Sequence, residues 1–198
     1  AMIKARPVAG NIKAGKRLLK SLDSFVYRRY FDYGSFDSFR DMKQRIVQQV
    51  KDKRLENNIK LGAGGIREIE FFGQLFQLIR GGVEPRLKER KILRVLDLLV
   101  DHRCIDRSAS RDLTLAYHFL RRVEKRLQMA GDRQTHGIPK TSEARTILAC
   151  AMGYQDWAAF KPDLDYHMER VHFHFNQLLV SDDEQQADTE LEVLKEMW

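Results

Sequence analysis

The chain has 198 residues, of which 43% are hydrophobic and 32% are charged, with four prolines and twelve glycines. This composition is typical of a folded globular protein and excludes disordered and collagen-like classes. No apolar run approaches the roughly 20 residues of a membrane span, no signal-peptide pattern opens the chain, and two cysteines are too few for a disulfide framework or a zinc site. We therefore expect a soluble, cytoplasmic protein that does not act at a membrane.

Positive charge is concentrated in the first half of the chain. Residues 1–100 hold 22 Lys and Arg against 11 Asp and Glu, whereas residues 181–198 hold one against seven, within a net charge of +7. A basic half suits a nucleotide phosphate, a nucleic acid or an acidic protein surface, and a solvated basic face is the alternative. Because cations alternate with acids at helical spacing and no aromatic–basic motif of an RNA-binding sheet occurs, we expect no nucleic-acid partner.

Taken in chain order, the apolar residues recur at the spacing of amphipathic helices almost throughout. Pro7 and Gly10 end an opening element, and residues 25–31 form an apolar run too short to decide between a strand and a helix. Candidate N-caps are Ser35 or Asp37, Ser108 or Ser110, and Thr141 or Ser142. The expected helices cover about 11–22, 36–50, 66–80, 87–100, 108–127, 142–153 and a last segment with Pro162 at its start, where a missing N–H is harmless.

These elements predict an all-α fold, an antiparallel bundle of about six or seven helices, because no strand–helix alternation is visible and the loops are short. The bundle is expected to span residues 11–180, after an opening remnant of another element over residues 1–10. Residues 181–198 form an acidic linker and the start of a further helical segment, in which Leu191, Leu194 and Trp198 share one face.

The most informative stretch is the glycine turn Gly62-Ala63-Gly64-Gly65, which directly precedes an expected helix. Glycines at a helix start can expose backbone N–H groups that bind phosphate at the positive end of the helix dipole. The stretch is not a P-loop, because no Gly-Lys-Ser/Thr follows it. Two interpretations therefore stand, an anion site and a turn whose glycines allow close packing.

The following helix carries a polar stripe of Arg67, Glu70, Gln74 and Gln77 between two apolar sides. A helix that is apolar on two sides is expected near the centre of the bundle, and leaving buried polar groups unpaired costs roughly 1–3 kcal/mol each. The stripe must therefore find partners. Either Arg67 and Glu70 pair within the chain, or the stripe faces a water-filled cleft or another domain.

Other residues that suggest catalysis or metal binding are better explained as structural. Asp163 and Asp165 stand two apart, as do His172 and His174, so on a helix neither pair can hold one ion together. His118 and His167 have no neighbouring nucleophile or ligand set, and the cysteines suit small apolar positions. We expect no catalytic residue and no metal site within this chain.

Several stretches together carry a family resemblance. They are Lys60-Leu61-Gly62-Ala63-Gly64-Gly65-Ile66-Arg67-Glu68-Ile69-Glu70-Phe71, Gln77-Leu78-Ile79-Arg80-Gly81-Gly82, Glu84-Pro85, Ala1-Met2-Ile3-Lys4-Ala5-Arg6, Phe25-Val26-Tyr27-Arg28-Arg29-Tyr30 and Ala116-Tyr117-His118-Phe119-Leu120-Arg121-Arg122-Val123-Glu124. This set closely resembles the bacterial bifunctional glutamine-synthetase adenylyltransferase/deadenylylase family, and the likeness covers about residues 1–180.

The resemblance implies a parent enzyme with two nucleotidyltransferase modules, each followed by a helical domain. The sequence of residues 62–68 is similar to that of the first copy. The resemblance implies that the half with this copy removes AMP from a modified tyrosine of glutamine synthetase by phosphorolysis, and that the other half adds AMP from ATP. Both halves are implied to use Mg²⁺ with ATP or ADP. The implied partners are glutamine synthetase, the signalling protein PII and the enzyme's own nucleotidyltransferase modules, and glutamine is implied as an effector.

The chain departs from the family's catalytic module, in which a Gly-Ser or Gly-Gly turn is followed by Asp-x-Asp carboxylates that hold Mg²⁺. Here Gly34-Ser35 is followed by Phe36-Asp37-Ser38, without a second carboxylate. We therefore expect residues 1–10 to be the remnant of a preceding nucleotidyltransferase module, and the chain alone to be catalytically inactive with no tightly bound cofactor.

Three roles stay open for the helical domain. The first is completion of the adenylyl-removing site, with Lys60, the glycine turn, Arg67 and Glu70 facing the catalytic module and placing AMP or phosphate. Lys4 and Arg6, near the same junction, would add positive charge. The second is a docking module for PII, glutamine synthetase or the other catalytic half, and the third is a purely structural spacer.

Overall fold

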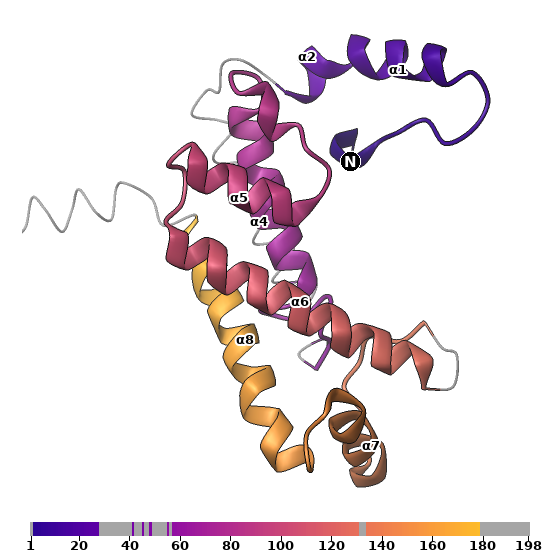
Figure 1. Ribbon diagram of the computed structural model, residues 1–198, viewed down its shortest axis with the longest axis vertical. Coiled ribbons are helices and arrows are strands. Elements are labelled where there is room, and N and C mark those ends of the chain that lie inside the picture. Colours follow the sequence, from indigo (N-terminus) through magenta and orange to yellow (C-terminus); the bar gives the residue numbers. More distant parts are fainter. Residues whose placement is uncertain are drawn as a thin grey trace, which may run out of the picture.

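The computed structural model describes residues 2–27, 57–130 and 134–178, together with residues 41, 45, 48 and 55. Within these residues every regular element is a helix, apart from an isolated antiparallel β-bridge between Asn58 and Gly137. The predicted all-α class is therefore confirmed. The elements are η1 (Met2–Lys4), α1 (Ile12–Ser21), α2 (Asp23–Val26), α4 (Ile66–Arg80), η2 (Pro85–Leu87), α5 (Ile92–Asp101), α6 (Arg107–Met129), α7 (Ser142–Met152) and α8 (Trp157–Gln177) (Figure 1).

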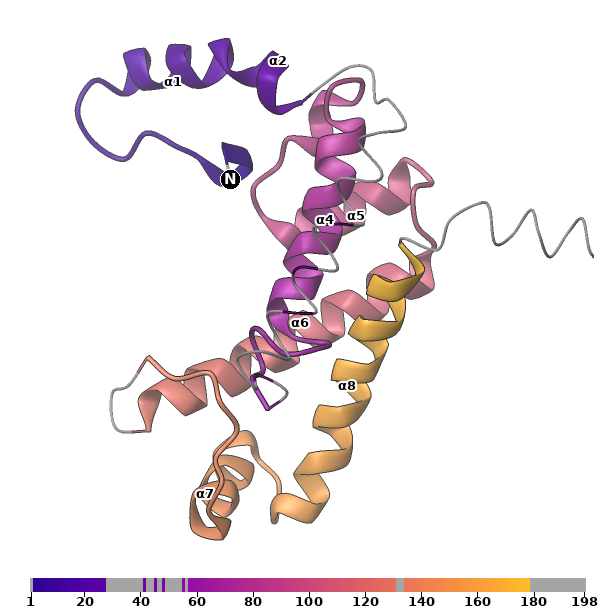
Figure 2. The ribbon, with the colours of Figure 1, turned by 180° about the vertical axis from the view of Figure 1, so that it is seen from behind.

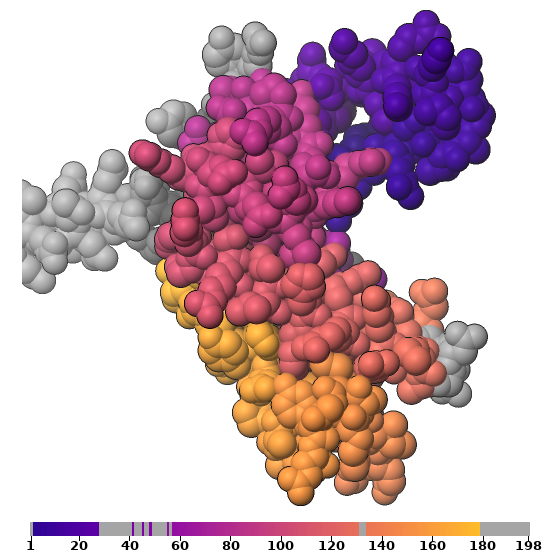
Figure 3. Space-filling view, viewed as in Figure 1, coloured from indigo at the N-terminus to yellow at the C-terminus, as the bar shows by residue number. Residues whose placement is uncertain are grey.

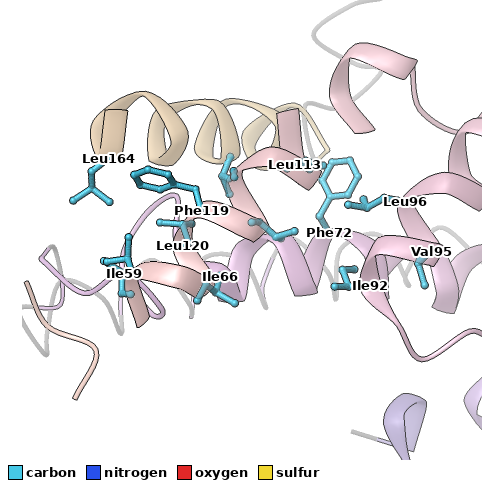
Figure 4. Packing of buried hydrophobic residues seen from close by; sticks show 14 of the residues in the cluster. Ile59, Ile66, Phe72, Ile92, Val95, Leu96, Leu113, Phe119, Leu120 and Leu164 are labelled. Atoms are coloured by element: carbon cyan, nitrogen blue, oxygen red, sulfur yellow. The ribbon is translucent and has the colours of Figure 1, made fainter. Parts of the chain in front are cut away.

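The core is built around α6, which packs against α4, α5, α7 and α8. Leu113, Leu120 and Val123 recur on one side of α6 and have no exposed surface, as expected for the apolar stripe of an amphipathic helix. Around them gather buried aliphatic and aromatic side chains from the neighbouring elements (Figure 4): Ile59, Ile66, Phe72, Ile92, Val95, Leu96 and Leu164. One continuous core therefore joins the helices from α4 to α8.

Helices α6 and α8 run antiparallel, as the predicted bundle requires. Near the start of α6, Asp112 accepts hydrogen bonds from Arg170 and lies 2.9 Å from the Nε2 atom of His174, both in the second half of α8. Farther along α6, Phe119 stacks on Phe160 from the first turn of α8, with ring centroids 5.9 Å apart. The two helices therefore pass each other in opposite directions.

Helices α4 and α8, by contrast, run in the same direction. Their contacts keep a constant separation of 104 residues: Gly64 with Met168, Glu68 with His172, and Phe71 with Phe175. The antiparallel arrangement thus describes α6 and α8 but not every pair in the bundle. The parallel pair brings the glycine turn before α4 against the middle of α8.

Helices α1 and α2 project from the rest of the molecule as a separate arm (Figures 1 and 2). No residue of α1 is buried, and the space-filling view shows the arm standing away from the helical body (Figure 3). The attachment lies at its end, where the Tyr27 ring is 8% exposed and a Cβ on Gly81 would be 2.7 Å from its Cδ1 atom. Lys88 Nζ also donates a hydrogen bond to Asp23 at 2.7 Å.

Three predicted helix starts are wrong, those of α5, α6 and α8. Residues 85–87 form the 3₁₀ turn η2, so α5 begins at Ile92 and not at Leu87. Asp106, in extended conformation, precedes α6, so Ser108 and Ser110 lie inside that helix. The Thr141 cap is confirmed, since its hydroxyl accepts from the N–H of Ala144 at 3.3 Å.

Pro162 lies inside α8 and not at its start, which corrects the third prediction. The side chain of Asp156 accepts the N–H of Ala159 at 2.8 Å and caps the helix, which therefore begins at Trp157. This start places Phe160 fully inside the core. Residues 25–31 are helical through Val26 within α2, and Tyr27 follows that helix. Residues 28–31 and 181–198 lie outside the described residues, as does the expected helix over 36–50 except at residues 41, 45 and 48, which are helical.

Candidate functional site

The glycines of the turn are required by close packing. Gly64 has φ of +72°, and a Cβ there would overlap the backbone carbonyl of Met168 on α8. Gly65 precedes α4 as its N-cap, and a Cβ on it would lie 2.8 Å from the carbonyl oxygen of Lys60. Only a residue without a side chain fits these two positions without strain.

The backbone N–H groups of the turn donate within the chain. The Gly62 N–H donates to the carbonyl of Asn58 at 2.8 Å, and the Gly65 N–H to the carbonyl of Gly62 at 3.0 Å. The Gly64 N–H donates to Oε2 of Glu68 at 2.9 Å, so a carboxylate of the chain itself occupies the place at which a phosphate would bind. Of the two interpretations of the turn, these contacts favour packing.

Glu68 is a buried acid that the sequence analysis did not single out. It is 6% exposed, and its Oε2 atom lies 3.3 Å from Nδ1 of His172 on α8 as well as accepting from Gly64. The carboxylate thus joins the glycine turn, α4 and α8. His172, which the sequence favours as a structural residue and not as a metal ligand, lies against this carboxylate.

A second buried acid, Glu124 of α6, lies beside Lys60. The Lys60 Nζ atom is 3.2 Å from Oε1 of Glu124, and Arg121 pairs with the other carboxylate oxygen. His136 Nδ1 lies 3.2 Å from Oε1 outside hydrogen-bonding geometry, and burial together with Lys60 lowers the pKa of His136. Lys60, a predicted site residue, is therefore tied to α6 by a carboxylate that is 3% exposed.

The polar stripe of α4 divides into an outer and an inner part. Glu70 accepts a hydrogen bond from Lys4 Nζ at 2.9 Å, and Arg67 is exposed on the same helix. Gln77, which is 2% exposed, donates from Nε2 to the carbonyls of Leu87 and Glu89, both at 2.5 Å. Glu70 thus takes its partner from the N-terminal segment, while Gln77 holds the loop before α5 from inside.

Tyr117 of α6 interacts electrostatically with Glu70 of α4 and with Arg121 and Glu124 of its own helix. Burial raises the pKa of its phenol; Arg121 opposes this, and Glu70 and Glu124 add to it. The guanidinium of Arg121 also lies over its ring, 6.0 Å from the centroid. We call the resulting surface the α4–α6 polar face, defined by Lys4, Lys60, Arg67, Glu70, Tyr117, Arg121 and Glu124. Tyr117 and Glu124 belong to a stretch that carried the family resemblance, and that was the available signal for them.

Arg6, the remaining predicted site residue, does not lie with the glycine turn. It is exposed and lines, with Lys4, a cavity of about 280 Å³ whose other wall is the loop of Glu89, Arg90 and Lys91. The predicted residues therefore separate into two neighbouring places, with Lys4 belonging to both.

The remaining candidates take separate partners. Asp163 accepts the hydroxyl of Tyr154, while Asp165 pairs with Lys161. The ring of His167 packs on Phe119 at 4.5 Å between centroids, and burial lowers its pKa. Within the described residues, no three His, Cys, Asp or Glu side chains are grouped as a metal site would need.

A cavity of about 970 Å³ lies away from the polar face, between α4, the start of α6 and the second half of α8. Phe72, Phe76 and Phe173 line it beside Arg103, a non-glycine residue with φ of 54°. Sequence periodicity cannot locate such a space because its walls come from several separate helices and from the loop before α6. Among the helices of the described part, none is long and apolar enough to cross a membrane.

Comparison with known proteins gives one family. Residues 40–179 match the model of the GlnD PII-uridylyltransferase family. The chain is 54% identical over 181 residues to the bifunctional glutamine synthetase adenylyltransferase/adenylyl-removing enzyme of Nitrosococcus oceani, 48% identical over 181 residues to that of Thioalkalivibrio sulfidiphilus, and 44% identical over 198 residues to that of Pseudomonas syringae pv. tomato. These matches cover 91%, 91% and 98% of this chain but 19%, 19% and 20% of the relatives. The chain therefore spans about a fifth of the enzymes it matches, and it belongs to the GlnD PII-uridylyltransferase family.

Proposed function

We propose that this chain is a helical domain of a bifunctional glutamine synthetase adenylyltransferase/adenylyl-removing enzyme. In this proposal it supports the removal of AMP from adenylyl-tyrosine of glutamine synthetase by phosphorolysis. The names of the relatives support the activity of the parent enzyme. The sequence of the glycine turn supports the assignment of the chain to the adenylyl-removing half. The partners are glutamine synthetase and the enzyme's own nucleotidyltransferase modules, with PII as regulator, and the compartment is the cytoplasm.

The observation that carries the proposal is the ion pair between Lys4 and Glu70. Lys4 belongs to the N-terminal segment that we expect to continue from the catalytic module, and Glu70 belongs to the outer stripe of α4. Their contact at 2.9 Å supports a junction beside the α4–α6 polar face. A catalytic module entering at Lys4 would therefore meet Arg67 and Arg121 at its boundary.

The residues of this face are suited to assisting a neighbouring phosphoryl-transfer site, and not to catalysing the transfer themselves. Glu70 and Glu124 are each paired with Lys or Arg, a donor set that does not fit Mg²⁺, which binds oxygen ligands without competing cations. We accordingly assign Mg²⁺ and ATP or ADP to the nucleotidyltransferase modules. The exposed Arg67 is the group of the face that we assign to contact AMP or phosphate held there.

A second candidate function, docking of an acidic partner such as a regulator, has its own observation. Helix α1 presents Lys13, Lys16, Arg17 and Lys20 on an exposed arm that has no buried residue. Four cations within ten residues favour association with a negatively charged surface, with a rate that falls as salt is added.

The test is a chimera in which this chain replaces the matching segment of the Nitrosococcus oceani enzyme. We expect Arg67→Ala to lower phosphate-dependent AMP release from adenylylated glutamine synthetase by about tenfold or more, through lost positioning, at an unchanged melting temperature. Arg94→Ala, an exposed arginine on α5, is the matched control and should retain activity. Full activity of Arg67→Ala, or a loss that only follows the melting temperature, would rule out a part for this face in the adenylyl-removing site and leave docking or a spacer role.

A further inference from the structure

Basic side chains from two distant segments meet at one small cavity. Lys4 and Arg6 of the N-terminal segment line one wall, and Glu89, Arg90 and Lys91 line the other, around about 280 Å³. The cavity is thus lined by four cations and one acid, and one of the cations, Lys4, is also paired with Glu70. Such a lining attracts anions and is small enough to match a phosphate-sized group rather than a whole protein surface.

The single acid in the lining does not cancel this attraction. The Glu89 carboxylate accepts the backbone N–H groups of Arg90 at 2.6 Å and Lys91 at 3.0 Å. These two hydrogen bonds are the main cause of its lowered pKa. The Glu89 carboxylate therefore fixes the backbone at Arg90 and Lys91, and four cationic side chains outnumber its single negative charge.

The wall formed by Arg90 and Lys91 is held in place from inside the protein. Gln77 donates to the carbonyls of both Leu87 and Glu89, and the Leu87 side chain is fully buried. The opposite wall is anchored by Ile3, which is 8% exposed, and by the Lys4–Glu70 pair. Cations on fixed backbone lose less freedom on binding a ligand than cations on a mobile loop.

The start of α5 adds positive potential at the same point. Lys91 is the N-cap of this helix, and its side chain makes no capping hydrogen bond. The positive end of the α5 dipole therefore reinforces the four side-chain cations, a combination that stabilises phosphate oxygens in proteins.

We propose that this basic cavity binds a phosphate group through Arg6, Arg90 and Lys91, with Lys4 shared between the phosphate and Glu70. The inference deepens the proposed function and rests on it for the physiological source, which is either inorganic phosphate, the co-substrate of phosphorolysis, or the phosphate of AMP. At both the glycine turn and the loop before α5, backbone N–H groups donate within the chain, so the loop is favoured by its cationic side chains and not by its N–H groups.

The first experiment titrates inorganic phosphate into the 198-residue chain at low salt and follows backbone N–H resonances by NMR. We expect saturable shifts at Arg90 and Lys91, and an affinity about tenfold lower in the double variant Arg90→Gln/Lys91→Gln, the scale of losing two charge-assisted hydrogen bonds. The double variant Arg94→Gln/Lys125→Gln removes the same charge from exposed positions outside the cavity and should bind phosphate normally.

Three results would overturn the proposal: no saturation, an equal loss in the control variant, or tighter binding of an acidic peptide than of phosphate at the same resonances. AMP in place of phosphate separates the two sources, because tighter binding of AMP assigns the cavity to the nucleotide. Because this experiment measures binding, an inactive chimera in the AMP-removal assay would not contradict phosphate binding by the cavity. A different outcome would overturn this inference alone. In that case the chimera is active, and Arg90→Gln/Lys91→Gln changes neither the KM of the chimera for phosphate nor the phosphate-induced NMR shifts of the chain.

Discussion

Gly64 is the residue at which the packing of the turn is decided. Its φ of +72° is unfavourable for residues with a side chain, and a Cβ would overlap the Met168 carbonyl. We predict that Gly64→Ala lowers the free energy of unfolding by about 3 kcal/mol, through backbone strain and overpacking. The control is Gly137→Ala, where a Cβ meets nothing within 4 Å and φ is not positive. Urea denaturation of both variants measures the difference, and equal stabilities would contradict the packing role.

Two buried acids, Glu68 and Glu124, show what residue patterns leave undetermined. Each looks like an ordinary charged position of an amphipathic helix, and each is buried because its partners come from elsewhere in the chain. Glu124 meets Lys60, 64 positions earlier, and Glu68 meets His172, 104 positions later. Local periodicity reports which side of a helix is apolar, but it does not report which cation a distant segment brings to it.

At the scale of elements, α6 and α8 are joined by an ionic clamp. Burial alone would raise the pKa of Asp112, but hydrogen bonds from His174 and Arg170 outweigh it and lower that pKa below the model-compound value of 3.8. A carboxyl with a lowered folded-state pKa stabilises the fold above its unfolded-state pKa, and this stabilisation is lost as the pH falls through the folded-state value.

We therefore predict that Asp112→Asn lowers the free energy of unfolding by about 2 kcal/mol at pH 7, the scale of hydrogen bonds to a charged group. The difference from the wild type should shrink as the pH falls below the unfolded-state pKa of 3.8. Asp97→Asn, which breaks an exposed pair with Arg94 at 3.6 Å, should cost little at either pH. Urea titrations across this range test the sign, and a gap independent of pH would refute the clamp.

Helix interiors were predicted well from the sequence, whereas several helix starts were not. The predicted helix over 66–80 coincides with α4, because apolar spacing and flanking glycines agree there. The starts of α6 and α8 are misplaced because a serine or a proline lies near the true N-cap residues Asp106 and Asp156, and the start of α5 because residues 85–87 form a 3₁₀ turn. Which capping residue is used depends on where Phe160 and its neighbours reach the core, and that is a tertiary effect.

On the scale of the whole molecule, the α1–α2 arm is attached through Tyr27. Its ring is buried against Gly81, and Lys88 lies 4.9 Å above the ring centroid. We predict that Tyr27→Ala speeds hydrogen–deuterium exchange of residues 12–27 and of the facing loop by about tenfold or more, through loss of a buried aromatic contact. Exchange in α6 and α8 should not change. Phe25→Ala, whose ring is 74% exposed, is the matched control, and a similar effect of both changes would rule out this attachment.

Some members of the candidate site could be proposed from the sequence, but their arrangement could not. Lys60, Arg67 and Glu70 were identified from one stretch, and Lys4 and Arg6 from their position near the start of the chain. Their separation into a polar face and a basic cavity depends on the loop before α5, which Gln77 holds from the far end of α4. No local pattern connects these segments, because their contacts arise only when the helices pack.

The contact between the glycine turn and α8 restricts the side chain at position 64 but not at position 168. The three atoms nearest to a Cβ at Gly64 would be backbone atoms of Met168, namely its carbonyl oxygen, carbonyl carbon and Cα. The identity of residue 168 is therefore free with respect to this contact, while residue 64 is fixed. In a saturation library selected for folding, position 64 should retain glycine alone, whereas position 168 should accept several apolar residues of similar volume.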